Sequence, residues 1–137
     1  MAGYVLDTSA LIAYLYDENG ADTAERIIFS GEHVLVPFVA VMEVEYKLLR
    51  ELPAETSEQM NVLLNWPIEV IESTPVWRGA AAQIKAPGRI SFADAWVASL
   101  ALLNDAELVH KDPEFDAVPS LKSLRLPYDR DSGRRSR

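Results

Sequence analysis

Residues 4–20 read YVLDTSALIAYLYDENG, and this stretch decides the fold. The short apolar run Tyr4–Leu6, closed by Asp7, predicts a strand. Apolar residues at helical spacing over Ser9–Asp17 predict a helix directly behind it, which Asn19-Gly20 ends. A strand that leads at once into a helix, repeated along a chain, is typical of an α/β fold.

The same alternation continues outward to the end of the chain. Further strands are predicted at His33–Val36, Ile68–Ile71 and Glu107–His110, with a fifth at Leu121–Leu126. Helices are predicted over Thr23–Phe29 (with a capping box at Asp22 and Glu25), Val39–Leu52 (Val41, Val44, Leu48 and Leu52 inside), Ala54–Asn65, Pro75–Lys85 (capped by Thr74) and Ser91–Leu103, with one helical turn after Asp112-Pro113. We therefore predict a single α/β domain whose central, mostly parallel sheet of four to five strands carries helices on both faces.

Composition narrows the class of protein. The 137 residues suit one domain, and the 49% apolar fraction is enough for a core. Because the chain has no cysteine, disulfides, thiolate metal sites and cysteine nucleophiles are excluded, as is usual in a reducing cytosol. No stretch approaches the roughly 18 apolar residues that span a membrane. The apolar N-terminus lacks a basic leader and contains Asp7, so we expect a cytoplasmic protein without a secretory signal.

The net charge of −8 is unevenly spread. Arg125–Arg137 holds five arginines and two aspartates, a net charge of +3, whereas the rest of the chain carries −11. An acidic body argues against simple electrostatic binding of nucleic acid, unless divalent cations or the arginines offset that field. We predict that residues 1–126 form the domain and that residues 127–137 are a basic, flexible tail.

Four acids stand where a site is expected in such a sheet. Asp7 closes the first strand and Asp112 follows the fourth, and sites in open α/β sheets form beyond the carboxyl ends of the strands where strand order reverses. Glu43 lies at the border of a buried helix face, and Asp94 stands three residues after Ser91. If the four carboxylates converge, their pKa values rise unless a cation is present, and hard oxygen ligands favour Mg²⁺ or Mn²⁺.

Each acid also has an ordinary structural interpretation. These are a helix cap at Asp7 or Ser9, an ion pair of Glu43 with Lys47, a capping box of Ser91 with Asp94, and a cap at Asp112 before Pro113. Glu45 competes with Glu43 for the second position, and Glu114 and Asp116 compete with Asp112 for the fourth. The hypothesis of a shared site therefore depends on all four acids together.

Four segments of the chain, residues 4–10, 41–50, 91–98 and 108–115, together resemble the PIN-domain ribonucleases, and most of all the VapC-type toxins of toxin–antitoxin pairs. The resemblance runs from Tyr4 to about Leu126. It implies that the catalytic and metal-binding acids are Asp7, Glu43, Asp94 and Asp112, and that Ser9 supports them. It also exposes one departure, because this family usually has threonine or serine where this chain has His110. A histidine there has several possible roles: a hydrogen bond to the site, a phosphate contact, titration near neutral pH, or a purely structural role.

The resemblance further implies hydrolysis of RNA, of the tRNA or rRNA class, with Mg²⁺ or Mn²⁺ as cofactor. It implies a cognate antitoxin as partner and a homodimer, with no role at a membrane. Arg50, Lys111 and the tail arginines are candidate phosphate contacts. The aromatic residues Tyr14, Tyr16, Tyr46 and Trp66 are candidates for a groove, a dimer face or the core.

Two other functions remain open from the sequence. An aspartate-based phosphoryl-transfer domain also has an acid at the end of its first strand. However, a dehalogenase-type phosphatase needs a second aspartate where Ser9 stands, and a receiver domain needs an aspartate at the end of its third strand, near Glu72-Ser73. A non-catalytic PIN-like binding module is the other alternative.

Overall fold

The computed structural model describes residues 3–127, which form one α/β domain. The described residues contain five strands: β1 (Tyr4–Leu6), β2 (Val34–Pro37), β3 (Glu69–Ile71), β4 (Glu107–His110) and β5 (Ser123–Arg125). All neighbouring strands pair in parallel, in the order β3-β2-β1-β4-β5. The predicted parallel sheet is therefore confirmed. The predicted basic tail lies outside the described residues except for Pro127.

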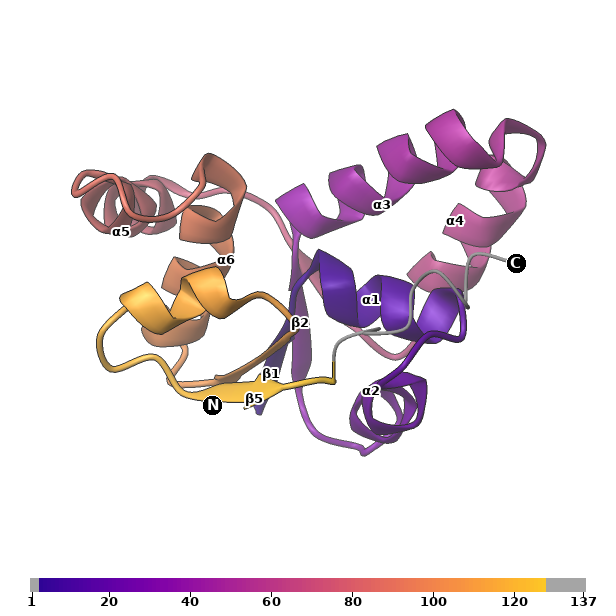
Figure 1. The fold of residues 1–137 in the computed structure, drawn as a ribbon, viewed down its shortest axis with the longest axis horizontal. Coiled ribbons are helices and arrows are strands. Elements are labelled where there is room, and N and C mark those ends of the chain that lie inside the picture. The colour runs from indigo at the N-terminus through magenta and orange to yellow at the C-terminus, as the bar shows by residue number, and fades with distance from the viewer. Residues whose placement is uncertain (1–2, 128–137) are drawn as a thin grey trace.

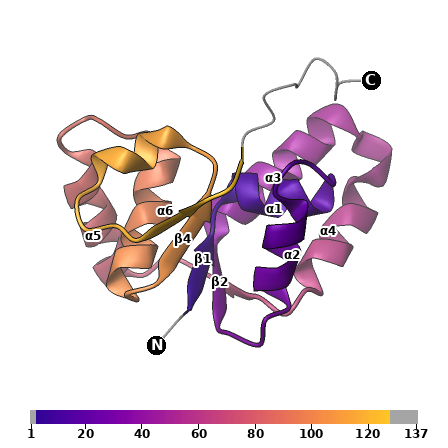
Figure 2. The same cartoon turned by 60° about the horizontal axis from the view of Figure 1, so that its bottom comes forward.

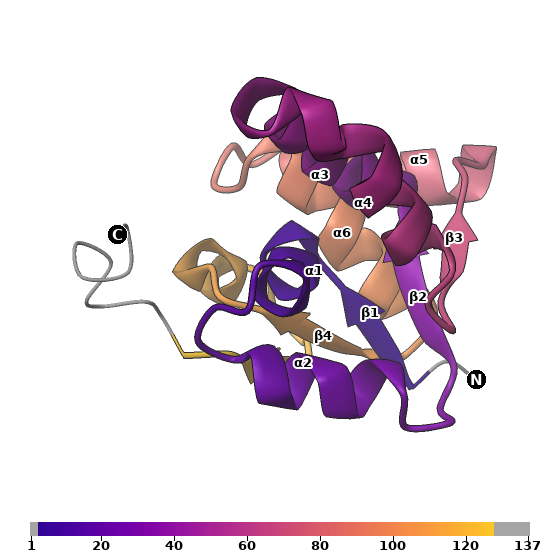
Figure 3. The same cartoon turned by 90° about the vertical axis from the view of Figure 1, so that its right-hand side faces the viewer.

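Helices cover both faces of this sheet, as predicted (Figures 1 and 2). They are α1 (Thr8–Leu15), α2 (Ala21–Ile28), α3 (Phe38–Glu51), α4 (Thr56–Leu64), α5 (Pro75–Lys85) and α6 (Phe92–Leu103), with short 3-10 helices η1 (Pro53–Glu55) and η2 (Pro113–Ala117). Helices α5 and α6 lie on one side, and α1 to α4 lie on the other. Figure 3 shows α3 and α4 together above α1, with α2 below it. None of the described helices is long and apolar enough to cross a membrane.

Alternating side chains of the strands divide the core into two clusters. Val5 and Leu35 point into the cluster that contains α5 and α6, whereas Leu6 and Val36 point into the cluster under α1 to α4. Such alternation is what the pleat of a strand buried on both faces requires. Of the candidate aromatics, Tyr14, Tyr16 and Trp66 pack against the second cluster. Only Tyr46 is largely exposed, at 43%.

The order of strands reverses at β1. The chain moves outward from β1 to β2 and β3, then returns to the other side of β1 to form β4 and β5. Leu6 pairs with Val109, and the backbone N–H of Asp7 donates to the carbonyl of Val109 at 3.2 Å. The carboxyl ends of β1 and β4 therefore meet at the reversal point, which is where such folds bind ligands.

Two local predictions were wrong. The proposed capping box at Asp22 and Glu25 does not form, because α2 begins earlier and its N-cap is Gly20, without a side-chain cap. Leu52 was expected inside but is 39% exposed, since α3 ends at Glu51 and Pro53 opens a separate 3-10 helix.

Gly20 explains the early start of α2 and allows a test. Its φ is +93°, and an added Cβ would lie 3.1 Å from Cβ of Leu126, which is 2% exposed. We expect Gly20→Ala to lower the free energy of unfolding by more than about 1 kcal/mol, because alanine is strained at positive φ and crowds Leu126.

The matched control is Gly79→Ala. Gly79 lies inside α5 with nothing within 4 Å of an added Cβ, so alanine should stabilise the protein by about 0.5–1 kcal/mol. Urea unfolding of both variants provides the measurement. Equal stability changes in the two variants would contradict the role assigned to Gly20.

Candidate functional site

Asp7 ends β1 and begins α1 with its side chain buried, at 5% exposed. Its Oδ1 accepts hydrogen bonds from the backbone N–H of Ala10, at 3.0 Å, and from the hydroxyl of Ser9, at 2.6 Å. Burial raises the pKa of Asp7 to about 7, although both hydrogen bonds act in the opposite direction. Asp7 is therefore both the N-cap of α1 and a carboxyl group whose charged form is disfavoured by burial.

Ser9 connects the ends of the two central strands. Its hydroxyl donates to Asp7 and accepts from the backbone N–H of Lys111, at 3.0 Å, just after β4. The side chain that is next to the first acid thus spans β1 and β4. This geometry is compatible with the supporting role expected of Ser9.

Asp94 is the third residue of α6, whose N-cap is Ser91. The hydroxyl of Ser91 accepts from the backbone N–H of Asp94 at 3.1 Å, which is half of the predicted capping box. The other half differs, because the N–H of Ser91 donates to Oε1 of Glu114, at 2.9 Å, in place of Asp94. Glu114 takes over that capping contact.

Asp94 and Asp112 come together, with Glu114 beside them. One carboxylate oxygen from each of these three residues lies within 4.8 Å of the others. Burial, followed by the contacts with Asp112 and Glu114, raises the pKa of Asp94 to about 8. The charge of Asp7 acts in the same direction, so the first, third and fourth predicted acids interact.

Glu43, in α3, lines the same cavity but is not one of the three carboxylates that lie within 4.8 Å of one another. Its Oε1 accepts a hydrogen bond from the hydroxyl of Thr8 in α1, a contact that the sequence analysis missed. Among the described residues no ion pair joins Glu43 to Lys47, so the surface pair considered above does not form. The competing Glu45 is exposed.

All four predicted acids line one cavity of about 640 Å³. The other lining residues are Thr8, Ser9, Ile12, Glu18, Tyr46, Lys47, Ser91 and Lys111. The raised pKa values of Asp7 and Asp94 mean that their charged forms are disfavoured in this cavity, and a bound cation would favour those charged forms. Carboxylate oxygens are the hard donors that Mg²⁺ and Mn²⁺ prefer, and three of them, from Asp94, Asp112 and Glu114, lie close enough together to share one ion.

The basic candidates differ in their surroundings. The side chain of Lys111 is 8% exposed, and its Nζ lies 3.4 Å from Oε1 of Glu18. Arg50 is exposed and lies over the ring of Tyr46, 5.5 Å from its centroid. Of these two, only Lys111 lines the cavity of the acids, and Lys47 joins it there.

His110 lies behind the cavity rather than in its wall. It is the last residue of β4 and fully buried, and burial lowers its pKa below the usual value. Its Nδ1 accepts a hydrogen bond from the backbone N–H of Asp112, at 3.0 Å. Asp112 in turn caps η2, because its Oδ1 accepts from the N–H of Glu114, at 2.9 Å.

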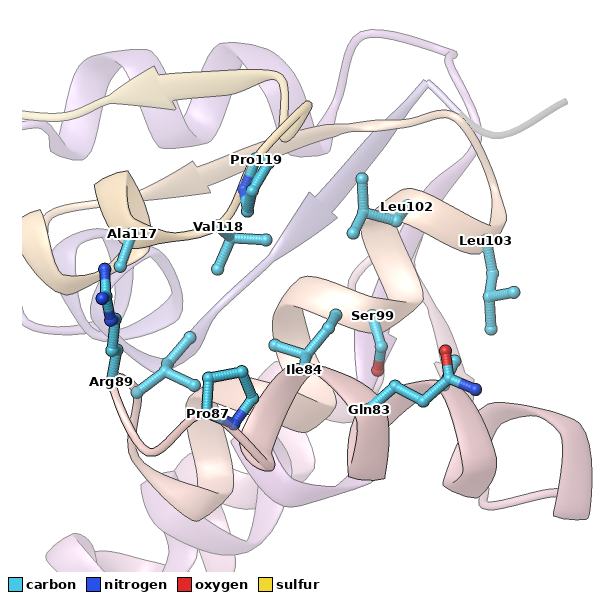
Figure 4. Close-up of a pocket in the computed structure, with 12 residues that line it drawn as sticks. Gln83, Ile84, Pro87, Arg89, Ser99, Leu102, Leu103, Ala117, Val118 and Pro119 are labelled. Atoms are coloured by element: carbon cyan, nitrogen blue, oxygen red, sulfur yellow. The ribbon is translucent and has the colours of Figure 1, made fainter.

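A second cavity, of about 440 Å³, lies between α5, α6 and the segment after η2 (Figure 4). Its walls are mainly apolar, with side chains such as Ile84, Leu102 and Val118, and its one charged lining residue is Arg89. It contains none of the predicted site residues.

Comparisons with known proteins agree with the fold. The family model described as "PIN domain" matches residues 4–121. No curated protein matches the sequence. Among solved structures, DNA-bound VapBC from Salmonella typhimurium matches with a TM-score of 0.77 at 17% identity, covering 91% of this chain and 98% of that one.

Two further structures illustrate the range of the likeness. VapBC2 from Rickettsia felis, bound to a promoter DNA fragment, has a TM-score of 0.76 at 14% identity, covering 90% of this chain and 98% of that one. VapC20 from Mycobacterium tuberculosis, named a sarcin-ricin loop cleaving toxin, has a TM-score of 0.69 at 18% identity, covering 90% and 99%. At these identities the likeness is one of fold.

Proposed function

Because the chain belongs to the PIN domain family, we propose that it is a metal-dependent endoribonuclease and the toxin of a toxin–antitoxin pair. The proposed metal ligands are Asp7, Glu43, Asp94 and Asp112, which hold Mg²⁺ or Mn²⁺. The observation that carries the proposal is the meeting of Asp94 with Asp112 in a cavity that the other two acids also line. The supporting residues are Ser9 and His110.

Two of the proposed ligands are held by a neighbouring hydroxyl before any cation binds. Ser9 orients Asp7, and Thr8 orients Glu43. Asp94 has to lose its proton to hold a cation, since its pKa lies at about 8 without one. A divalent cation held by these carboxylates would supply an activated water for hydrolysis and positive charge beside the phosphoryl oxygens. No side chain is required as a nucleophile.

The substrate is structured RNA of the tRNA or rRNA class. Lys47 and Lys111 line the cavity beside the acids and offset the repulsion of an anionic backbone from an acidic protein. One structural relative is itself named for cleaving the sarcin-ricin loop. The domain of residues 1–126 carries the activity, and the basic residues beyond it add positive charge.

Cleavage of RNA by the purified chain tests the proposal. Structured RNA and DNA of the same sequence are incubated with Mg²⁺, Mn²⁺ or EDTA. We expect RNA to be cut only with metal, while DNA stays intact. If no RNA is cut and metal does not raise the melting temperature either, the chain is a non-catalytic module. The phosphoryl-transfer alternative predicts a covalent phosphoprotein with acetyl phosphate, for which this mechanism has no step.

An antitoxin partner is supported by an apolar stripe near the cavity. Met42, Tyr46 and Leu49 follow one another at helical spacing on α3 and are 57%, 43% and 54% exposed. Tyr46 also lines the acidic cavity, so a partner segment on this stripe reaches the acids. The net charge of −8 favours a basic partner. Several structural relatives are VapBC or toxin–antitoxin complexes.

We also propose a homodimer. Val76 at the start of α5 and Phe92 at the start of α6 are 73% and 70% exposed. Association of two copies would remove such apolar surface from water. Light scattering on the purified chain distinguishes a mass of two chains from that of one.

A further inference from the structure

His110 combines a buried position with one specific polar contact. The side chain is 0% exposed, and its ring packs edge-to-face against Phe115 with centroids 4.7 Å apart. Nδ1 accepts a hydrogen bond from the backbone N–H of Asp112. A buried ring that does not line the cavity cannot contact a phosphate or a cation there. The remaining functional role is a hydrogen bond that acts through Asp112.

The hydrogen bond from Asp112 fixes the protonation state of the His110 ring. A nitrogen that accepts from an amide N–H carries no proton, so the ring is neutral with its proton on Nε2. Nε2 is buried and has no hydrogen-bond partner among residues 3–127. An unsatisfied buried donor is unfavourable, and an apolar side chain of similar size would avoid it. What such a side chain lacks is the acceptor at Nδ1.

We propose that His110 is a positioning residue for metal binding, because its Nδ1 anchors the backbone of Asp112 and so directs that carboxylate toward Asp94. The inference rests on the proposed function. Two hydrogen bonds then fix Asp112, one on its backbone N–H and one from Glu114 on its Oδ1.

The test separates positioning from packing with three variants of the full chain. His110→Asn keeps an acceptor at the place of Nδ1, His110→Gln moves it to the place of Nε2, and His110→Leu removes it. The dissociation constant for Mn²⁺ is measured by electron paramagnetic resonance of the free ion, and the melting temperature is measured without metal.

We expect His110→Gln and His110→Leu to weaken Mn²⁺ binding by about tenfold or more, because loss of a hydrogen bond to a ligand has an effect of this size at metal sites. His110→Asn should bind Mn²⁺ within about threefold of the original chain, although the smaller side chain leaves a gap beside Phe115 and lowers the melting temperature. The inference is overturned if all three bind Mn²⁺ as the original chain does, or if affinity simply follows melting temperature. Failure of the original chain to bind Mn²⁺ would instead overturn the proposed function, and this inference with it.

Discussion

Asp94→Asn is expected to abolish metal-dependent RNA cleavage, lowering the rate at least about a hundredfold, because a lost ligand removes several kcal/mol of charge stabilisation. The fold should survive, and the melting temperature without metal should stay the same or rise. The reason is the pKa of about 8, which leaves Asp94 mainly protonated near neutral pH, and asparagine resembles a protonated carboxyl group in shape. Gel analysis of labelled RNA gives the rate.

The matched control is Asp116→Asn. It makes the same substitution in η2, at an exposed residue whose Oδ2 lies 3.5 Å from Nη1 of Arg125. We expect it to cut RNA like the original chain. If both variants and the original cut equally, the activity comes from a contaminating nuclease. If Asp94→Asn alone remains active, Asp94 is not a metal ligand.

The second large effect is on the pH dependence of stability. Burial raises the pKa values of Asp7 and Asp94 in the folded protein to about 7 and about 8, from the ordinary aspartate value of 3.8. At pH values between 3.8 and these raised pKa values, the native state binds more protons than the unfolded chain. These two groups therefore make the metal-free protein less stable as pH rises. A cation competes with the same protons. We therefore expect Mn²⁺ to bind about tenfold to a hundredfold more tightly at about pH 8 than at about pH 6.

Melting temperatures with and without Mn²⁺ at both pH values measure this effect. The gain on adding Mn²⁺ should be clearly larger at the higher pH. In a double variant, Asp7→Asn with Asp94→Asn, Mn²⁺ should no longer raise the melting temperature. The metal-free stability of this variant should also no longer decline as pH rises. A gain of the same size at both pH values would contradict the raised pKa values, whereas the Asp116→Asn control should behave like the original chain.

Much of the fold could be predicted because local signals and tertiary structure agree. Thr74 caps α5 through the N–H of Trp77, as the Thr-Pro pair predicted, and α5 ends at Lys85. The capping box at Asp22 failed because α2 begins one residue before Asp22, with Gly20 as its N-cap at a φ of +93°, and an added Cβ at Gly20 would crowd Leu126 from far along the chain. Sequence patterns contain the first kind of signal and not the second.

The candidate site shows the same division. The position of Asp7 at the end of β1 followed from one apolar run. The position of Asp112 just past β4, on the other side of the point where strand order reverses, followed from the alternation of strands and helices. Glu114 was only a competitor in the sequence, because its contact with the N–H of Ser91 joins residues 23 apart. Because Glu114 accepts from Ser91, the carboxylate of Asp94 is not used in a capping box and can lie beside Asp112. No pattern of residue spacing in the sequence predicts this arrangement.

The order of strands also bears on how the protein is made. β1 is synthesised first, but its neighbour β4, with the fourth acid just beyond it, comes near the end of the described chain. At about 5–20 residues per second, the ribosome needs roughly 5–20 s between the first acid and the fourth. An unfinished chain therefore has no complete acid cluster. Products of interrupted translation should lack nuclease activity, and a partner made in that interval would be present before the site exists.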